Sequence, residues 1–140
     1  MVVFTERLDP TQADVDAILA TLAASEVADG HVSGYQPFSV LLSDEADGPV
    51  TGGIYGYQLF DWLFIQYLSV PTTLQGQGIG RELMVRAEAW ARMRGLAGIW
   101  LDTFAFQARP FYEQLGFSVF GTIENHPRGS RRYFLQKRLD

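Results

Sequence analysis

The stretch QGQGIGR at residues 75–81 is the most informative local feature of this 140-residue sequence. An apolar run at residues 62–70, which predicts a buried strand, precedes it, and residues 78–94 carry apolar side chains at helical spacing. Glycine allows tight turns and close approach of a ligand to the main chain, and a helix N-terminus presents unpaired N–H groups at the positive end of the helix dipole. The stretch therefore predicts an anion site that suits a phosphate, with a simple glycine-rich turn as the alternative.

Two common phosphate-binding patterns are absent from this stretch. A P-loop has Lys followed by Ser or Thr after its last glycine, whereas Arg81 and Glu82 follow Gly80. A dinucleotide fingerprint has the spacing GxGxxG, but counting from Gly76 the third glycine comes one residue early. The ligand must therefore be identified from the rest of the chain.

The elements around the stretch predict one mixed α/β domain over residues 1–140. Asp9-Pro10 is a typical helix start, with Asp9 as the N-cap, and the apolar spacing after it predicts a helix that ends before Gly30. Strands are expected at residues 38–42, 50–60, 62–70, 99–103, 117–123 and 133–137, and further helices at 78–94 and 107–115. Short turns join the first three strands, which predicts an antiparallel meander.

Composition argues against several classes of function. The 11 Lys and Arg residues against 16 Asp and Glu residues give a net charge of -5, whereas nucleic-acid-binding proteins carry a basic face. The absence of cysteine excludes disulfides, thiolate metal ligands and a cysteine nucleophile. His31 and His126 stand alone in separate loops, so no metal site is expected. A cluster of basic residues near the end of the chain is expected to be solvated: Arg128, Arg131, Arg132, Lys137 and Arg138.

Nothing in the sequence suggests a membrane protein. Residues 1–7 lack the basic start and long apolar run of a signal peptide. The most apolar stretch, residues 57–70, is interrupted by Asp61 and is shorter than the roughly 20 residues that span a bilayer. We therefore expect a cytoplasmic protein without a membrane partner.

Two motifs together indicate a family. Gln75, Gly78 and Gly80 fit the pattern Q/R-x-x-G-x-G/A, and residues 111–117, FYEQLGF, follow after one helix and one strand. With these motifs in this order, residues 50–137 resemble the GNAT family of N-acetyltransferases, and LDTFAFQA at residues 101–108 is similar to a bacterial subgroup of it. The resemblance implies a twisted, mostly antiparallel sheet, flanked by helices, in which the family's fourth and fifth strands splay apart.

The resemblance also implies that the chain binds acetyl-CoA as its acyl donor. Main-chain N–H groups of residues 77–81 would hold the pyrophosphate, and the backbones of Leu68 and Val70 would pair with pantetheine at the splay. Where many family members carry an Asn that bonds pantetheine, this chain has Ala105, so that contact falls to Thr103 or Gln107 or is lost. The residues expected to bind the donor are Leu68, Val70, Gln75, Gly76, Gln77, Gly78, Ile79, Gly80, Arg81, Gln107 and Tyr112.

Three residues are candidates for the chemistry. Tyr112 matches the family tyrosine that gives a proton to the leaving thiolate, with plain packing against the sheet as the alternative. A general base is needed to deprotonate the acceptor amine, and Asp61 and Asp102 are the candidates. The alternatives are a turn role for Asp61 and a structural hydrogen bond for Asp102. Aromatic residues at Trp62, Tyr67, Phe104 and Phe106 would flank the acceptor, although most aromatics at strand spacing belong to a core.

These observations predict an enzyme that transfers an acetyl group to a primary amine directly, in a ternary complex, since no cysteine nucleophile exists. The amine, on a small molecule or a peptide, is not identified by the sequence. The alternative is a non-catalytic acyl-CoA sensor or protein-interaction module, which would keep the glycine loop and dispense with Tyr112. The sequence does not decide the oligomeric state, and the resemblance allows a homodimer.

Overall fold

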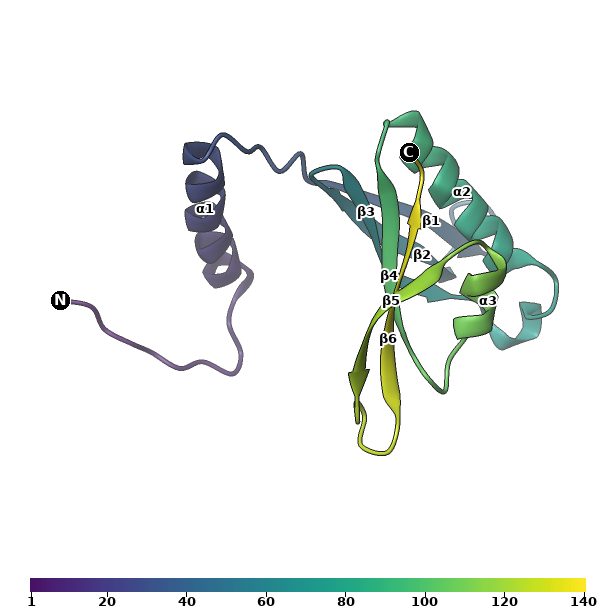
Figure 1. Ribbon diagram of the computed structural model, residues 1–140. Helices are drawn as coiled ribbons and strands as arrows, with labels where there is room; N and C mark the ends of the chain where they lie inside the picture. Colours follow the sequence, from purple (N-terminus) through teal and green to yellow (C-terminus); the bar gives the residue numbers. More distant parts are fainter. The chain divides into compact units, whose positions relative to one another are not determined.

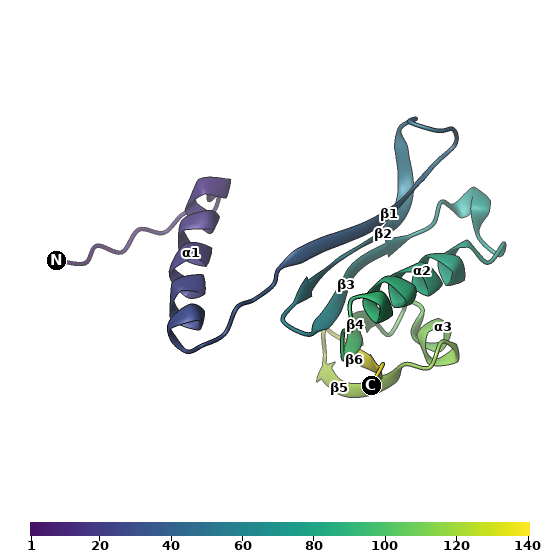
Figure 2. The same cartoon turned by 90° about the horizontal axis from the view of Figure 1, so that it is seen from above.

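Six strands form one sheet in the order β1-β2-β3-β4-β6-β5 (Figures 1 and 2). The computed structural model describes all residues, Met1–Asp140, in two compact units, Met1–Ser33 and Gly34–Asp140, and the sheet belongs to the second unit. The strands are β1 (Gln36–Ser43), β2 (Val50–Leu59), β3 (Trp62–Ser69), β4 (Gly98–Phe104), β5 (Ser118–Glu124) and β6 (Arg131–Arg138). The helices of the same unit are η1 (Thr72–Leu74), α2 (Ile79–Met93) and α3 (Arg109–Gln114).

The mixed α/β fold with a mostly antiparallel sheet is confirmed. Strands β1, β2 and β3 form the predicted antiparallel meander, and β6 is antiparallel to both of its neighbours. Strands β3 and β4 are parallel, and α2 makes the crossover that a parallel pair requires. Each predicted element exists, with its ends shifted by at most about two residues, as expected for frayed or capped termini.

The core lies between the sheet and the two longer helices of the unit, which Figures 1 and 2 show together on one face of the sheet. On α2, Leu83, Ala87 and Ala91 are buried, as the helical spacing predicted. They pack against the central strands, where Leu63 and Leu101 are fully covered. Full burial of each Leu or Ile contributes about 1.5–3 kcal/mol, so this layer holds α2 firmly against the sheet.

The other face of the sheet is aromatic. The rings of Tyr57, Phe64 and Trp100 follow one another across three strands, with centroid distances of 5.4 Å and 4.1 Å. These side chains are half-buried. Strand β3 is therefore central in the sheet and apolar on both faces, as its sequence predicted.

Strands β3 and β4 separate partway along their length. Their pairing runs from Trp62 opposite Gly98 to Ile65 opposite Leu101 and then ends. At the same level the register between β2 and β3 shifts next to Gly56, where a Cβ atom would lie 2.2 Å from the carbonyl oxygen of Phe64. Because such a contact is impossible, only glycine lets β2 approach β3 this closely at the register shift. The predicted splay is thus present, between β3 and β4 of this chain.

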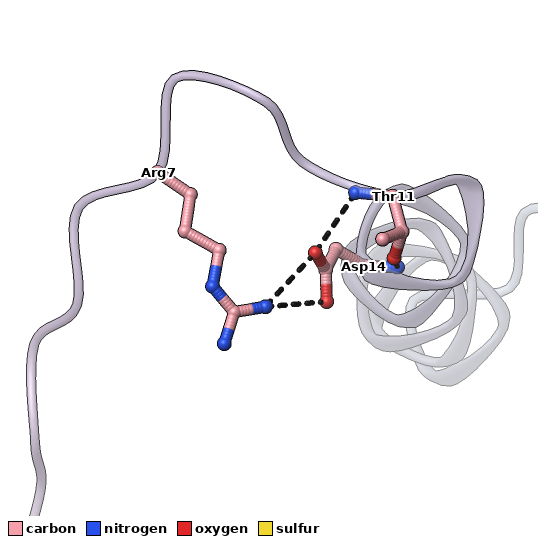
Figure 3. Close-up of polar contacts among 3 residues, drawn as sticks. All are labelled: Arg7, Thr11 and Asp14. Carbon is pink, nitrogen blue, oxygen red and sulfur yellow. Dashed lines mark hydrogen bonds and ion pairs between the residues drawn. The ribbon is translucent and has the colours of Figure 1, made fainter.

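The first unit contains α1 (Gln12–Ala28), which has Thr11 as its N-cap. The prediction that Asp9 caps this helix is wrong. The Thr11 hydroxyl accepts a hydrogen bond from the Asp14 N–H at 3.1 Å, and the Asp14 carboxylate accepts one from the Thr11 N–H at 2.9 Å (Figure 3). Arg7 adds an ion pair of 3.1 Å to Asp14. This reciprocal capping box satisfies two backbone N–H groups at once, which explains why the helix begins here.

None of the helices combines the length and the apolar character that a membrane crossing requires.

Candidate active site

The gap between β3 and β4 opens into a cavity of about 770 Å³. Its walls are the ends of the two splayed strands, the loop that leads into α2, and the first turn of α3. All but one of the residues predicted to bind the donor line it, namely Leu68, Val70, Gln75, Gly76, Gly78, Ile79, Gly80, Arg81, Gln107 and Tyr112. Gln77 is absent from the lining. The structure therefore gathers residues from both predicted motifs, far apart in the sequence, around a single space.

The glycine loop presents unpaired main-chain amides to this cavity. Gly76 and Gly78 have positive φ angles of 81° and 78°, and an added Cβ atom at either position would meet nothing within 4 Å. The glycines are therefore required by the backbone conformation and not by crowding. Gly78 is the N-cap of α2 and supplies no side chain to cap it, and no carbonyl of the chain accepts a hydrogen bond from the N–H groups of residues 76–81. This arrangement fits a diphosphate.

Arg81 makes the loop end of the cavity electropositive. It lines the cavity and forms no ion pair with any carboxylate of the chain. The nearby acidic residue of the first helical turn, Glu82, is instead paired with Arg86 at 2.9 Å. An unpaired guanidinium beside the positive end of a helix dipole favours an anionic ligand at this end.

The unpaired edge of β3 forms a second wall. Beyond Ile65 the strand has no partner on the β4 side, so its backbone groups face the gap. The Gln75 side chain donates a hydrogen bond to the Val70 carbonyl at 3.4 Å, and this contact ties the glycine loop to the end of β3. An exposed strand edge of this kind can pair with an extended chain such as pantetheine.

Gln107 offers a free donor to the cavity. Its side-chain oxygen accepts hydrogen bonds from the Phe104 N–H at 3.0 Å and the Thr103 hydroxyl at 3.2 Å. Because a backbone N–H can only meet an acceptor, these bonds fix which end of the amide is oxygen. The NH₂ group is left without a protein partner on a residue that lines the cavity. Ala105, at the position of the family asparagine, does not line the cavity.

Tyr112 is the buried phenol of the site. Its side chain is 9% exposed and packs edge-on against Phe111 and Phe117, with centroid distances of 5.1 Å and 6.2 Å. The hydroxyl has no hydrogen-bond partner in the chain, yet no fully covered side-chain polar atom is left unsatisfied, so the hydroxyl reaches the cavity. Burial, together with the nearby charge of Asp102, raises the pKa of Tyr112 to about 12. The phenol therefore stays protonated at neutral pH.

The two acidic candidates lie in different places. Asp102 lines the cavity on β4, is 17% exposed, and forms an ion pair of 2.8 Å with Arg132. Asp61 is exposed in the turn between β2 and β3, at the other end of β3, and does not line the cavity. There its carbonyl oxygen accepts a hydrogen bond from Ala97 at 2.7 Å. Only Asp102 is brought near Tyr112.

Of the predicted aromatic residues, only Tyr67 lines the cavity; Trp62 begins β3 at the paired end. The prediction that Arg132 is solvated is wrong, because its side chain is 29% exposed and pairs with Asp102 of the cavity. The alternation of residues around position 132 could have predicted which face of the strand Arg132 lies on. Its contact with Asp102 depends on the register that places Arg132 opposite Phe104, which the sequence does not give. No group of His, Cys, Asp and Glu is arranged to hold a metal ion.

Residues 13–117 match the family model described as the acetyltransferase (GNAT) family. The chain is 34% identical over 123 residues to acetyltransferase Atu2258 of Agrobacterium fabrum, covering 88% of this chain and 89% of that protein. It is 36% identical over 93 residues to a blasticidin-S acetyltransferase of Streptomyces morookaense, covering 66% and 68%. A crystal structure from Agrobacterium tumefaciens, of a protein classed as an acetyltransferase, has a TM-score of 0.89 and 31% identity, and the match covers 98% of this chain and 99% of that one.

The family match and the cavity agree on the donor. The matched region contains the glycine loop, the splayed strands and Tyr112, so the amides that fit a diphosphate lie in the part of the chain that the family shares. The protein is accordingly an acetyl-CoA-dependent acyltransferase, and it belongs to the GNAT family of acetyltransferases.

Proposed function

We propose that the protein transfers the acetyl group of acetyl-CoA directly to a primary amine, with both substrates bound at once. The observation that supports this most is the cavity at the β3–β4 gap, which joins the amide-rich loop to an unpartnered phenol and a carboxylate. A chain without cysteine has no thiol to carry the acetyl group between substrates. Direct attack by the amine is therefore the simplest route.

The donor would lie along the walls described above. Main-chain N–H groups of residues 76–81 and the Arg81 guanidinium would hold the diphosphate, and the unpaired edge of β3 at Leu68 would pair with the pantetheine arm. The free NH₂ group of Gln107 would donate to a pantetheine carbonyl, which replaces the contact that Ala105 does not make. These contacts would bring the thioester to Tyr112.

In the reaction, the neutral amine nitrogen attacks the thioester carbonyl, the N–C bond forms and the C–S bond breaks with its electron pair going to sulfur. The nitrogen then releases one proton, which is taken up by the thiolate to give the free thiol of coenzyme A. Tyr112 faces the leaving sulfur in this arrangement. A phenol with a pKa of about 12 holds its proton more firmly than a thiol, whose pKa is about 8.5. Tyr112 therefore stabilises the thiolate chiefly by donating a hydrogen bond to it, which is the weaker form of acid catalysis.

The acceptor ammonium must lose a proton before it attacks. Asp102 is the carboxylate that lines the cavity, and we assign it the role of receiving this proton, directly or through water. Asp61 is not assigned a role, because it lies outside the cavity. A small-molecule amine is the favoured class of acceptor, since a relative with 36% identity is named for acetylating blasticidin S. The alternative of a non-catalytic sensor is not favoured, because the similar proteins are acetyltransferases.

The test is thiol release from acetyl-CoA in the presence of a panel of primary amines, compared between the wild type and Tyr112→Phe. Turnover by the wild type and a loss on the order of 10²-fold in kcat in the variant are expected, because the stabilising donor is removed. Coenzyme A affinity, measured by calorimetry, should be unchanged in the variant. Binding of coenzyme A by a wild type that releases no thiol with any amine would contradict the proposed transfer.

A further inference from the structure

Arg132 binds one oxygen of Asp102 through a hydrogen bond and an ion pair. Its Nε and Nη2 atoms lie 2.9 Å and 2.8 Å from Asp102 Oδ1. The guanidinium is itself held between two rings, with its carbon 5.5 Å from the Phe104 centroid and 5.2 Å from the Phe134 centroid. The arginine side chain is 29% exposed, so its charge is largely shielded from water. The Asp102 carboxylate is thus fixed in position and orientation.

The second oxygen of Asp102 is left unengaged. No side chain or backbone group of the chain donates a hydrogen bond to Oδ2, although the residue lines the cavity. The carboxylate is close enough to Tyr112 for its charge to act on that phenol. One oxygen is therefore anchored, and the other is available to a ligand in the cavity.

We infer that Arg132 is a positioning residue: it anchors Asp102 through Oδ1 so that Oδ2 receives the amino group of the acceptor. This inference rests on the proposed function and names the contact that orients the nucleophile. An oriented amine and a fixed carboxylate lower the entropic cost of attack, because the nitrogen no longer has to search for the carbonyl carbon. A flexible carboxylate would bind an ammonium ion equally well and orient it less.

The location of the pair favours this role over a purely structural one. Removing two charges from water is costly, and apolar residues of similar volume would often stabilise such a site as well or better. A half-buried ion pair surrounded by aromatic rings is therefore weak evidence for stability alone. The neighbouring Arg131 shows the contrast: it pairs with Glu124 at 2.8 Å, both side chains are more than half exposed, and neither residue lines this cavity.

The experiment compares Arg132→Gln, Arg132→Lys, Asp102→Asn and the double variant Asp102→Asn/Arg132→Gln, with Arg131→Gln as the matched control. For Arg132→Gln we expect a loss of about 10-fold or more in kcat/KM for the amine and an unchanged affinity for coenzyme A. Arg132→Lys keeps the charge without the planar guanidinium and should recover only part of the loss. Arg131→Gln should be as active as the wild type.

The double variant separates positioning from structural support. If Arg132 acts through Asp102, the double variant should be no slower than Asp102→Asn alone, whereas independent structural damage would multiply the two losses. An Arg132→Gln enzyme within about twofold of the wild type, or losses that multiply, would overturn the inference while the proposed function stands. If the wild type itself turns over no amine, the proposed function and this inference fall together. Melting temperatures identify any variant that does not fold. If Arg132→Gln does not fold, the activity of Arg132→Lys is compared with that of the wild type instead.

Discussion

The two ends of the β3–β4 pair differ in their pairing: the strands are hydrogen-bonded at one end and separated at the other. From Trp62 to Ile65 the strands are hydrogen-bonded to each other, and the side chains facing α2 are buried in the core. Beyond Ile65 the pairing ends, and the backbone edge, Asp102 and Tyr112 border a cavity. The difference teaches that the paired end supplies the rigidity, and the open end supplies the backbone and polar groups that a substrate needs.

Substitutions of the two acidic candidates should give the largest difference in activity between the two ends. Asp102→Asn should lower kcat/KM for the amine on the order of 10²-fold, because an amide cannot accept the proton and carries no charge to bind an ammonium ion. Asparagine retains an oxygen for the hydrogen bonds from Arg132, which limits damage to the fold. Asp61→Asn, at the paired end, is expected to be within about twofold of the wild type. Steady-state kinetics on both variants with one amine checks this.

Equal activity of the two variants would contradict the assignment of Asp102. A loss in Asp61→Asn alone would move the base to the turn between β2 and β3, outside the cavity. Either result would mean that the open end of the strand pair binds acetyl-CoA but does not contain the general base.

The buried phenol gives a second test, through the dependence of stability on pH. Tyrosine in an unfolded chain has a pKa near 10, whereas the pKa of Tyr112 is raised to about 12 in the folded protein. Above pH 10 the unfolded state releases a proton that the folded state retains, so stability falls as the pH rises from about 10 to 12 and is unaffected below that range. The loss should amount to roughly 2–3 kcal/mol and be absent from Tyr112→Phe.

Urea unfolding of the wild type and the variant across this range measures the effect. Tyr67→Phe serves as the control, since Tyr67 is an exposed tyrosine of the same cavity and its removal should leave the alkaline loss in place. Parallel curves for the wild type and Tyr112→Phe would show that the phenol is not held in a shielded environment. The description of Tyr112 as a buried phenol with a raised pKa would then be wrong.

The glycine loop provides a matched pair of substitutions with a smaller effect. Gly78 and Gly95 both have positive φ, 78° and 70°, and an added Cβ would meet nothing at either position. Alanine should therefore cost about 1–2 kcal/mol of stability at each, through the same backbone strain. Only Gly78→Ala should weaken coenzyme A binding, by about 10-fold, because only there do the displaced amides face the ligand. Calorimetry and thermal unfolding of the two variants test this, and equal coenzyme A affinities would contradict the phosphate role of the loop.

Much of the site could be predicted because its signals are local. A glycine at positive φ before an amphipathic helix, and a phenol within a short motif such as residues 111–117, can be identified from a few neighbouring residues. The prediction of the meander depended in the same way on turn residues between consecutive strands. The order of strands β4, β6 and β5 was not accessible by this route, since it depends on pairing between distant segments.

The misses have the same physical origin. The contact of Arg132 with Asp102 follows from the register that sets Arg132 opposite Phe104 and diagonally across from Asp102, and a single sequence does not contain that register. Asp61 and Asp102 were both candidates for the base, and the structure places them at opposite ends of one strand pair. The start of α1 was misassigned because Asp9 and Thr11 are both good N-caps, and only the reciprocal bond with Asp14 distinguishes them.

The smallest effect is expected from Gln107→Glu, which removes one donor and adds one negative charge while keeping the shape of the side chain. Glutamate keeps an oxygen to accept from the Phe104 N–H and the Thr103 hydroxyl, and it lacks the NH₂ group that faces the cavity. Since one hydrogen bond contributes about 1 kcal/mol, coenzyme A affinity should fall by about fivefold. Gln114→Glu adds the same charge to the last residue of α3, outside this cavity, and should bind coenzyme A as the wild type does. Equal affinities for the two variants would contradict the assignment of Gln107. Thr103 would then make the pantetheine contact of the family asparagine, or the β3 edge alone would hold pantetheine.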